Sequence, residues 1–317
     1  MTTQVGAVRR DYRAPRSLSD PRPLGRGLLR TLTALCFLAP ALTILILFVA
    51  SPMLAALRTS FFSSSGFGPE TFVGGANYAR IFQDPLLVKA MGNTAIYAAL
   101  FTPVAVVVAL LVALVVADER LPFRGLLRSA LFLPFIVSLA VAAFAWGFLL
   151  DPQLGLLNYW LRGLGIRLGN VLQDPVLAMP TVVLVAVWKS FGFYMVVFVA
   201  GLQDIPRSLY EAARVDGAGA LRRFRSVTLP LLNNTLTFVV IFALIAALQA
   251  FDQIYVLTQG GPLHATDTVV TEIYQSGFKE LDLGIASALS YVLLGATLLL
   301  SLIQFALGSR REKDLAS

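Results

Sequence analysis

The sequence predicts an all-α integral membrane protein with six transmembrane helices, and three observations lead to this fold class. Of its 317 residues, 57% are hydrophobic and only 14% are charged, whereas about 25% are charged in an ordinary soluble domain. Five stretches of 22 residues or more contain no Asp, Glu, Lys or Arg, and a helix of that length spans a hydrocarbon core of about 30 Å. The basic residues are concentrated between these stretches.

The charge-free stretches define five spans, and a sixth stretch completes the membrane domain, which we expect over residues 31–310. Residues 175–203 are as apolar as the others but carry Lys189 at their centre. Prolines in or beside the spans predict kinked helices around a cavity. The charge-free stretches are 31–57, 90–117, 129–150, 226–251 and 283–309, and the prolines are Pro40, Pro52, Pro103, Pro134, Pro180 and Pro230.

The basic residues also predict the orientation. With the N-terminus inside, 18 of the 25 Lys and Arg lie in cytoplasmic segments and six in external ones, which is the bias of a multi-pass protein with both termini in the cytoplasm. Topology and attraction to anionic membrane lipid therefore account for the net charge of +7 without a nucleic-acid partner. Residues 1–30 are expected to be a disordered basic tail, and residues 311–317 a short cytoplasmic tail.

The composition also excludes several kinds of chemistry. A single cysteine, Cys36, allows no disulfide within the chain, and a single histidine, His264, excludes a multi-histidine metal site, so we expect no metal site. None of the four lysines follows a glycine, so a phosphate-binding P-loop is absent, and neither a Gly-x-Ser-x-Gly nor a His-Glu-x-x-His motif occurs. We therefore predict a protein that is not an enzyme and binds no cofactor.

The loop 204–228, between the fourth and fifth spans, predicts two short helices joined by a bend. Pro206 suits the first position of a helix, because its missing N–H costs nothing there. Gly217 is placed to end that helix. Leu209, Ala212 and Ala213 share one face, and the two alanines leave room for the backbone of another protein. An ordinary amphipathic surface helix is the alternative.

Several short phrases along this region resemble those of the binding-protein-dependent ABC import permeases, and in particular their carbohydrate-uptake branch. The resemblance runs from about residue 30 to residue 310 and implies the type I ABC importer permease fold in a bacterial inner membrane. The phrases are Trp188-Lys189-Ser190-Phe191-Gly192-Phe193, Ala200-Gly201-Leu202-Gln203-Asp204-Ile205-Pro206, Glu211-Ala212-Ala213, Asp216-Gly217-Ala218, Leu229-Pro230 and Leu257-Thr258-Gln259-Gly260-Gly261-Pro262.

In that family the cytoplasmic loop forms a coupling helix, here 206–217, that docks on a separate ATPase subunit. The resemblance implies a second permease subunit, a dimer of ABC ATPases that carries ATP and Mg, and an extracytoplasmic solute-binding protein. Asn233 stands where many relatives have a proline, which we expect to alter only a kink. The implied docking residues are Glu211, Ala212, Ala213, Asp216 and Gly217.

The expected solute path centres on Lys189, since an ionisable residue inside the membrane usually marks a functional path. No span offers it an Asp or Glu. Its ammonium must therefore find water, a backbone carbonyl, the solute or a neighbouring subunit. A lysine that donates to helix carbonyls and never meets solute is the alternative. Ala186, Ser190 and Phe193 share its helix stripe.

In similar maltose-type permeases this stripe helps to form the sugar site together with the fifth span, where four alanines here leave space. Trp188 is expected to be an aromatic platform, or simply to pack against neighbours. Gln249, Asp252 and Gln253 are expected to form a polar rim of the path, or to cap a helix. The alanines at the matching positions are Ala243, Ala246, Ala247 and Ala250.

We therefore predict a permease subunit of an ATP-driven sugar importer that works by alternating access. The phrase that ends at Pro262 is similar to the F-like subunit of maltose permeases and favours a heterodimer. A homodimeric permease for another small solute, such as a glycerol phosphate or another polyol, is the runner-up. A membrane protein without transport activity is a further alternative. Lys189 suits a phosphate, but its neighbourhood is also similar to permeases for neutral sugars, so both solute classes stay open.

Overall fold

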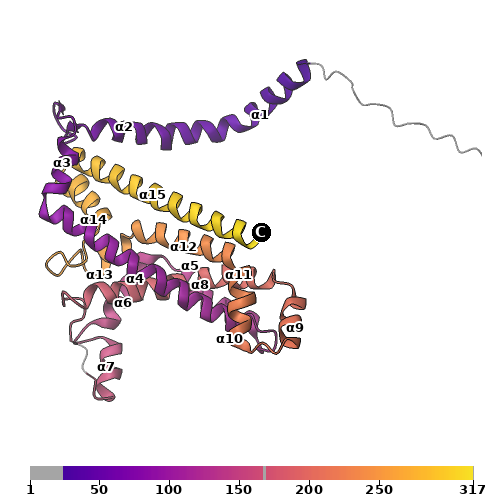
Figure 1. Ribbon diagram of the computed structural model, residues 1–317. Helices are drawn as coiled ribbons and strands as arrows, with labels where there is room; N and C mark the ends of the chain where they lie inside the picture. Colours follow the sequence, from indigo (N-terminus) through magenta and orange to yellow (C-terminus); the bar gives the residue numbers. More distant parts are fainter. Residues whose placement is uncertain (1–23, 167–168, 317) are drawn as a thin grey trace, which may run out of the picture. The chain divides into compact units, whose positions relative to one another are not determined.

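The computed structural model describes residues 24–166 and 169–316, with side chains over 33–166 and 169–306. The chain forms two units, Met1–Ala55 and Ala56–Ser317, which we describe one at a time (Figure 1). Residues 1–23 of the predicted tail, Arg167 of a predicted external segment and the terminal Ser317 lie outside the described residues.

The described part of the first unit is a long apolar helical run. Helix α1 (Leu24–Leu45) continues through a π-helical turn, η1 (Ile46–Ala50), into α2 (Ser51–Thr59). Residues 24–30, at the end of the predicted tail, are thus helical. The wider turn lies just ahead of Pro52, which has no N–H to give to the preceding turn. The stretch Thr33–Thr59 is long and apolar enough to cross a membrane.

The second unit supplies the remaining spans. Three of its helices are long and apolar enough to cross a membrane: α4 (Pro85–Val116), α8 (Ala178–Gln203) and the Leu283–Ala306 part of α15 (Leu283–Ala316). Two further pairs of helices pass the same test only together, as broken spans. With each pair taken as one span, the described residues contain the six predicted spans.

The two broken spans are sharply bent. Helix α5 (Arg124–Ile136) meets α6 (Leu139–Leu150) at 94°, and Ala220–Leu231 meets α12 (Asn233–Leu248) at 71°. Pro134 lies two residues before α5 ends, and Pro230 lies one residue before α11 ends. Both bends thus follow closely after prolines for which kinks are predicted.

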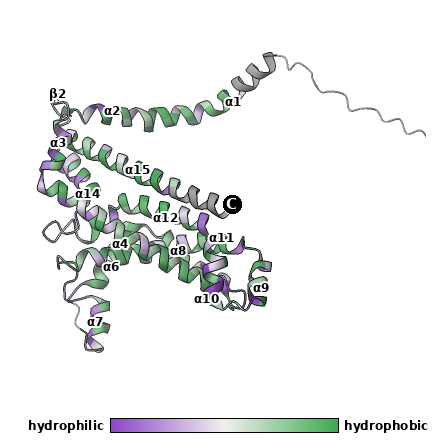
Figure 2. Cartoon of the chain, in the orientation of Figure 1, coloured by the Kyte–Doolittle hydropathy of each residue, from purple (hydrophilic) through white to green (hydrophobic). Residues whose placement is uncertain are grey.

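The core of this unit lies where α4 packs against α8 and α12. Ala105, Ala109 and Ala113 form a fully buried column along α4, and small residues let membrane helices approach closely. The contact between α8 and α5 is closer still, since a Cβ atom at Gly192 would lie 2.3 Å from the carbonyl oxygen of Leu131. In Figure 2 these helices are largely coloured as hydrophobic.

Shorter elements occupy the two ends of the unit, and Figure 1 shows α9 and α10 at the end opposite α13 and α14. A small antiparallel hairpin and several short helices lie at the α13 end. These are β1 (Phe62–Ser63), β2 (Thr71–Phe72), α3 (Ala76–Gln83), α7 (Leu156–Gly163), α13 (Asp252–Leu257), α14 (Val269–Tyr274) and the π turn η3 (Gln275–Lys279). The α9 end holds α9 (Arg207–Val215), α10 (Ala220–Arg223), the π turn η2 (Phe224–Thr228) and α11 (Leu229–Leu231).

Candidate functional site

A cavity of about 210 Å³ lies where α4, α6 and α8 meet the end of α12 and the start of α13. Its wall combines apolar and aromatic side chains with a few polar groups, which is the usual make-up of a site for a small organic ligand. The lining residues are Tyr97, Phe101, Leu139, Ala186, Ser190, Ala246, Gln249, Ala250, Phe251, Asp252 and Gln253.

A break in the helix creates the polar part of this wall. Helix α12 ends at Leu248 and α13 begins at Asp252, so residues 249–251 are irregular backbone at the edge of the apolar core. Irregular backbone within a membrane domain is tolerated where protein buries it or where it lines a water-filled space. The break brings Gln249, Asp252 and Gln253 to the same cavity.

Gln253 is the most informative polar residue of the cavity. Its side chain is almost fully buried, and its Nε2 donates a hydrogen bond to the hydroxyl of Tyr97 at 2.7 Å. The other end of the amide has no hydrogen-bond partner within the described part of the chain. Because buried polar groups are almost always hydrogen-bonded, this unpaired amide oxygen beside the cavity is unusual, and among the described residues it shares this state with side-chain atoms of Thr102, Asn158 and Gln304.

Some of the residues predicted for the path line this cavity, and others do not. The structure brings together Ala186 and Ser190 on α8 with Ala246, Gln249, Ala250 and Asp252 on the following elements. Ala243 and Ala247 are fully buried in the core between helices instead. Trp188 lies at the side of α8, 37% exposed, with its ring edge-to-face against Trp146 at 5.4 Å.

Lys189 is bonded within the chain. Its Nζ donates to the carbonyl oxygen of Phe135 at 3.0 Å and lies 4.6 Å from the centre of the Phe135 ring. That ring also stacks on Phe193 at 4.9 Å. Helix α5 ends at Ile136, so the Phe135 carbonyl lies in a last turn that lacks helical amide partners. Of the partners considered for the ammonium, the structure shows a backbone carbonyl.

Four of the lining residues are not among those that the sequence predicts, namely Tyr97, Phe101, Leu139 and Phe251. Tyr97 carried a usable signal, because a tyrosine in an apolar span needs a partner for its hydroxyl. Phe101, Leu139 and Phe251 carried none, since apolar side chains occur throughout the spans.

The predicted docking residues lie together on α9 and just after it. Pro206 precedes the first residue of the helix, and Gly217 ends it with a φ of +72°. No residue of α9 is buried, and Ala212 is exposed, whereas Ala213 is half-buried. Glu211, Asp216 and Gly217 are exposed as well.

Two side-chain contacts attach α9 to the rest of the unit. Arg207 pairs with Glu119 in the loop after α4, and the Tyr210 hydroxyl lies 3.0 Å from Oγ1 of Thr228. A groove of about 670 Å³ lies between that loop and α9, lined by Asp118, Glu119, Arg124, Arg207 and Glu211 among others.

Comparison with known proteins identifies relatives over most of the chain. Residues 87–313 match the family described as "Binding-protein-dependent transport system inner membrane component". The chain is similar to the probable ABC transporter permease protein YurN of Bacillus subtilis, with 37% identity over 84% of this chain and 93% of the relative. It is also 38% identical to the sulfoquinovosyl glycerol transport system permease protein SmoG of Agrobacterium fabrum, over 83% and 85% of the two chains.

A further relative is the sn-glycerol-3-phosphate transport system permease protein UgpA of Brucella abortus, with 37% identity over 86% of this chain and 94% of the relative. Among solved structures, a bacterial ABC transporter involved in the import of the acidic polysaccharide alginate superimposes with a TM-score of 0.79 at 24% identity, over 90% of this chain and 98% of that one. This likeness concerns the fold, and it confirms the predicted all-α class.

Proposed function

The chain belongs to the family of inner-membrane components of binding-protein-dependent transport systems, and from this premise we propose that it forms half of the path of a sugar-class solute. It is a multi-pass permease subunit with the type I ABC importer fold, and not an enzyme. ATP hydrolysis belongs to a separate ATPase.

The observation that carries the solute class is the half-satisfied amide of Gln253 in the wall of the cavity. A sugar hydroxyl both donates and accepts hydrogen bonds, so it can complete either end of an amide. Gln249, Asp252 and Ser190 add polar groups to the same wall, and Tyr97, Phe101 and Phe251 add aromatic surface. Polar groups among aromatic rings suit a polyhydroxyl solute.

A glycerol phosphate is the second candidate, because relatives named for sn-glycerol-3-phosphate transport are 37% identical to this chain. The cavity favours the sugar. Asp252 contributes a carboxylate to the wall, which repels a phosphate, and the ammonium of Lys189 is bonded to Phe135. The relative named for sulfoquinovosyl glycerol transport shows that this family includes proteins named for sugar derivatives.

The proposed assembly pairs this chain with a second, similar permease, two ATPase subunits that bind ATP and Mg, and an extracytoplasmic binding protein. One related transporter structure is described in complex with a periplasmic protein that holds an alginate pentasaccharide. The exposed α9, with Ala212 on its surface, is the proposed docking element for the ATPase. In this assembly the α9 end and both termini face the cytoplasm.

Transport then proceeds by alternating access. Closure of the ATPases on ATP moves α9, and α9 is continuous in the chain with α8 before it and with the α10 to α12 segment after it. The elements that frame the cavity therefore move with the docking helix. Nucleotide and solute each act through their different affinities for the inward-open and outward-open states.

The solute class is tested on the cognate binding protein by calorimetry with neutral sugars and with glycerol phosphates. Binding of a sugar, and uptake of that sugar by proteoliposomes that hold the whole assembly, supports the proposal. Binding and uptake of glycerol phosphate alone supports the second candidate. An assembly that contains no ATPase contradicts both.

The role of the cavity is tested by Gln253→Leu, which keeps the size of the side chain and removes its polar end. We expect sugar uptake to fall at least about tenfold, because the solute loses a buried hydrogen bond. Gln83→Leu is the matched control, since Gln83 is an exposed residue at the end of α3, and it leaves uptake unchanged. Normal uptake by a Gln253→Leu assembly of normal thermal stability contradicts the proposal.

A further inference from the structure

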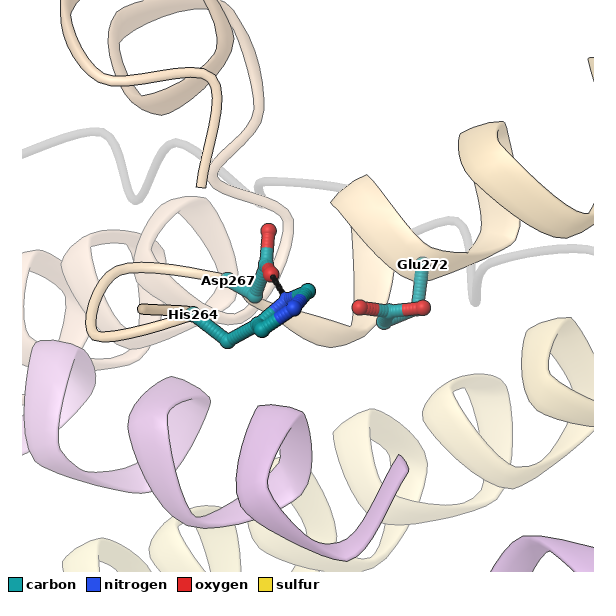
Figure 3. Close-up of side chains that lie close together, drawn as sticks. All are labelled: His264, Asp267 and Glu272. Atoms are coloured by element: carbon teal, nitrogen blue, oxygen red, sulfur yellow. Dashed lines mark hydrogen bonds and ion pairs between the residues drawn. The ribbon is translucent and has the colours of Figure 1, made fainter. Parts of the chain in front are cut away.

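Three side chains capable of binding a metal converge beside α14, outside the spans. His264 and Asp267 lie in the loop between α13 and α14, and Glu272 lies on α14 itself (Figure 3). Nδ1 of His264 lies 2.5 Å from Oδ2 of Asp267, and one ligand atom from each of the three residues lies within 4.8 Å of the other two. In Figure 3 the Glu272 carboxylate lies beside the His264 imidazole, and the Asp267 carboxylate lies on another side of the same ring.

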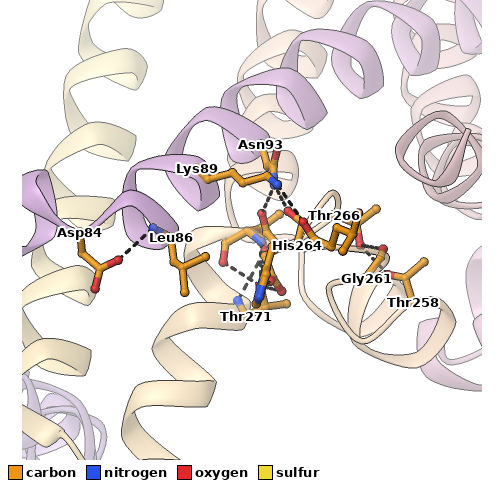
Figure 4. Close-up of polar contacts among 12 residues, drawn as sticks. Asp84, Leu86, Lys89, Asn93, Thr258, Gly261, His264, Thr266 and Thr271 are labelled. Carbon is orange, nitrogen blue, oxygen red and sulfur yellow. Dashed lines mark hydrogen bonds and ion pairs between the residues drawn. The ribbon is translucent and has the colours of Figure 1, made fainter. Parts of the chain in front are cut away.

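The backbone that carries these side chains is fixed from α4. Nδ2 of Asn93 donates to the carbonyl oxygens of His264 and Asp267, each at 2.9 Å, and Nζ of Lys89 donates to that of Leu263 at 2.8 Å (Figure 4). The Asp267 carboxylate packs against Gly260 so closely that a Cβ atom there would lie 1.6 Å from Oδ1. The histidine and the aspartate are therefore held in place before any ligand arrives.

The two carboxylates of the cluster repel each other, and a bound cation would stabilise both. Asp267 and Glu272 place two carboxylates beside one imidazole, and the Asp267 side chain is only 13% exposed. The nearby Lys89 ammonium donates to a backbone carbonyl. A divalent ion between the two carboxylates relieves their repulsion and replaces the water that burial removes.

We propose that His264, Asp267 and Glu272 form a zinc site that links the loop between α13 and α14 to α14. Zinc accepts both imidazole nitrogen and carboxylate oxygen as ligands, and water can complete the tetrahedron. Ligand atoms about 2.0–2.2 Å from zinc lie about 3.4 Å from one another. Nδ1 of His264 and Oδ2 of Asp267 lie closer together than that, and all three ligand atoms lie within 4.8 Å of one another, so side-chain rotations bring them to zinc-binding distances.

The single cysteine and the single histidine of the sequence predict no metal site. The proposed site uses only one histidine. Its two carboxylates become candidate ligands because the fold brings them close to that histidine. The absence of a metal site remains a prediction, and a measurement of zinc binding decides between that prediction and the proposed zinc site. The inference concerns the loop alone and does not depend on which solute the protein transports.

The test measures zinc on the full chain in lipid nanodiscs, purified with an affinity tag that contains no histidine. After treatment with a chelator and dialysis against buffered Zn²⁺, we expect about one zinc per chain, because the cluster offers three protein ligands. His264→Gln and Glu272→Gln each lower the affinity at least about tenfold. The exposed Glu280→Gln, on the same side of the chain, is the control and retains zinc.

A second readout separates ligation from misfolding. Without metal, His264→Gln has the thermal stability of the unchanged chain, because the His264 side chain is about half exposed. With Co²⁺ in place of Zn²⁺, the unchanged chain gains the visible absorption of a tetrahedral site, and the two variants do not. Equal zinc content in the unchanged chain and His264→Gln, or no zinc in either, overturns the proposal.

Discussion

Lys189 shows how a charged residue can be accommodated within an apolar span. The break between α5 and α6 leaves the Phe135 carbonyl without a helical amide partner, and the lysine ammonium donates to it at 3.0 Å. The ring of the same phenylalanine lies 4.6 Å from that ammonium, which adds a cation–π attraction. Both contacts join α8 to the end of α5, so they give the lysine a structural role.

Lys189→Met tests that role. We expect the thermal stability of the purified chain to fall by an amount equivalent to about 0.5–1.5 kcal/mol, because the partly buried Phe135 carbonyl loses its donor. We expect the KM of uptake to change less than about twofold. Lys279→Met, which removes an exposed lysine near Tyr255, is the control. A KM raised tenfold with unchanged stability shows instead that the lysine meets the solute.

At the scale of single helices, α9 was the element that the sequence predicted most closely. Its first residue follows Pro206 and its end is set by Gly217, whose φ of +72° suits glycine. Pro206 and Gly217 each affect only the backbone a few residues away, so a local sequence pattern is enough to predict both ends of α9. The bend of 94° between α5 and α6 was predicted only as a kink near Pro134. The same helix α5 makes the close contact with Gly192 of α8, a packing feature that no local pattern encodes.

The difference between local sequence signals and packing between helices also explains which of the cavity residues could be predicted from the sequence. The helical spacing correctly grouped Ala186 with Ser190 on α8. Which face of α12 turns towards the cavity depends on how it packs against α4, so Ala246 lines the cavity while Ala243 is in the core. The contact between Tyr97 and Gln253 joins residues far apart in sequence, and only the fold brings them together.

Docking through α9 is tested by Ala212→Trp. A bulky ring on this exposed face is expected to lower ATP-driven uptake at least about tenfold without loss of expression, because overpacking an interface costs about 1–3 kcal/mol. Ala213→Trp is expected to act in the same way, but Ala213 is half-buried, which makes Ala212 the cleaner site. Ala212→Ser keeps the side chain small and serves as the control. Unchanged uptake in Ala212→Trp contradicts docking at this face.

At the scale of the whole chain, the second unit has two chemically distinct ends. The α9 end carries Arg207, Arg214, Arg222, Arg223 and Arg225 over a short stretch. The opposite end carries α13, α14 and the loop between them, with Asp252, Asp267 and Glu272 (Figure 1). This asymmetry is the physical basis of the orientation that we propose, since basic segments are retained in the cytoplasm.

Single cysteines test the orientation. In a Cys36→Ala background, Leu263→Cys is expected to react with a membrane-impermeant maleimide in intact cells, and Ser208→Cys only after the membrane is opened. Both residues are exposed, so burial does not confound the comparison. The outcome is read as the labelled fraction on a gel. The reverse pattern places α9 outside and removes the basis for docking to an intracellular ATPase.

The way the loop between α13 and α14 is attached has a consequence for how such a protein diversifies. The donors on Lys89 and Asn93 reach main-chain oxygens of residues 263, 264 and 267, and every amino acid has a main-chain oxygen. The outward side chain of Leu263 can thus be exchanged without loss of these hydrogen bonds, whereas His264 is a ligand of the proposed zinc site. The positive φ at position 263 restricts that exchange to residues that tolerate it, such as glycine and asparagine. Related proteins can therefore change the exposed surface of this loop by substitution alone, while its backbone keeps the same path.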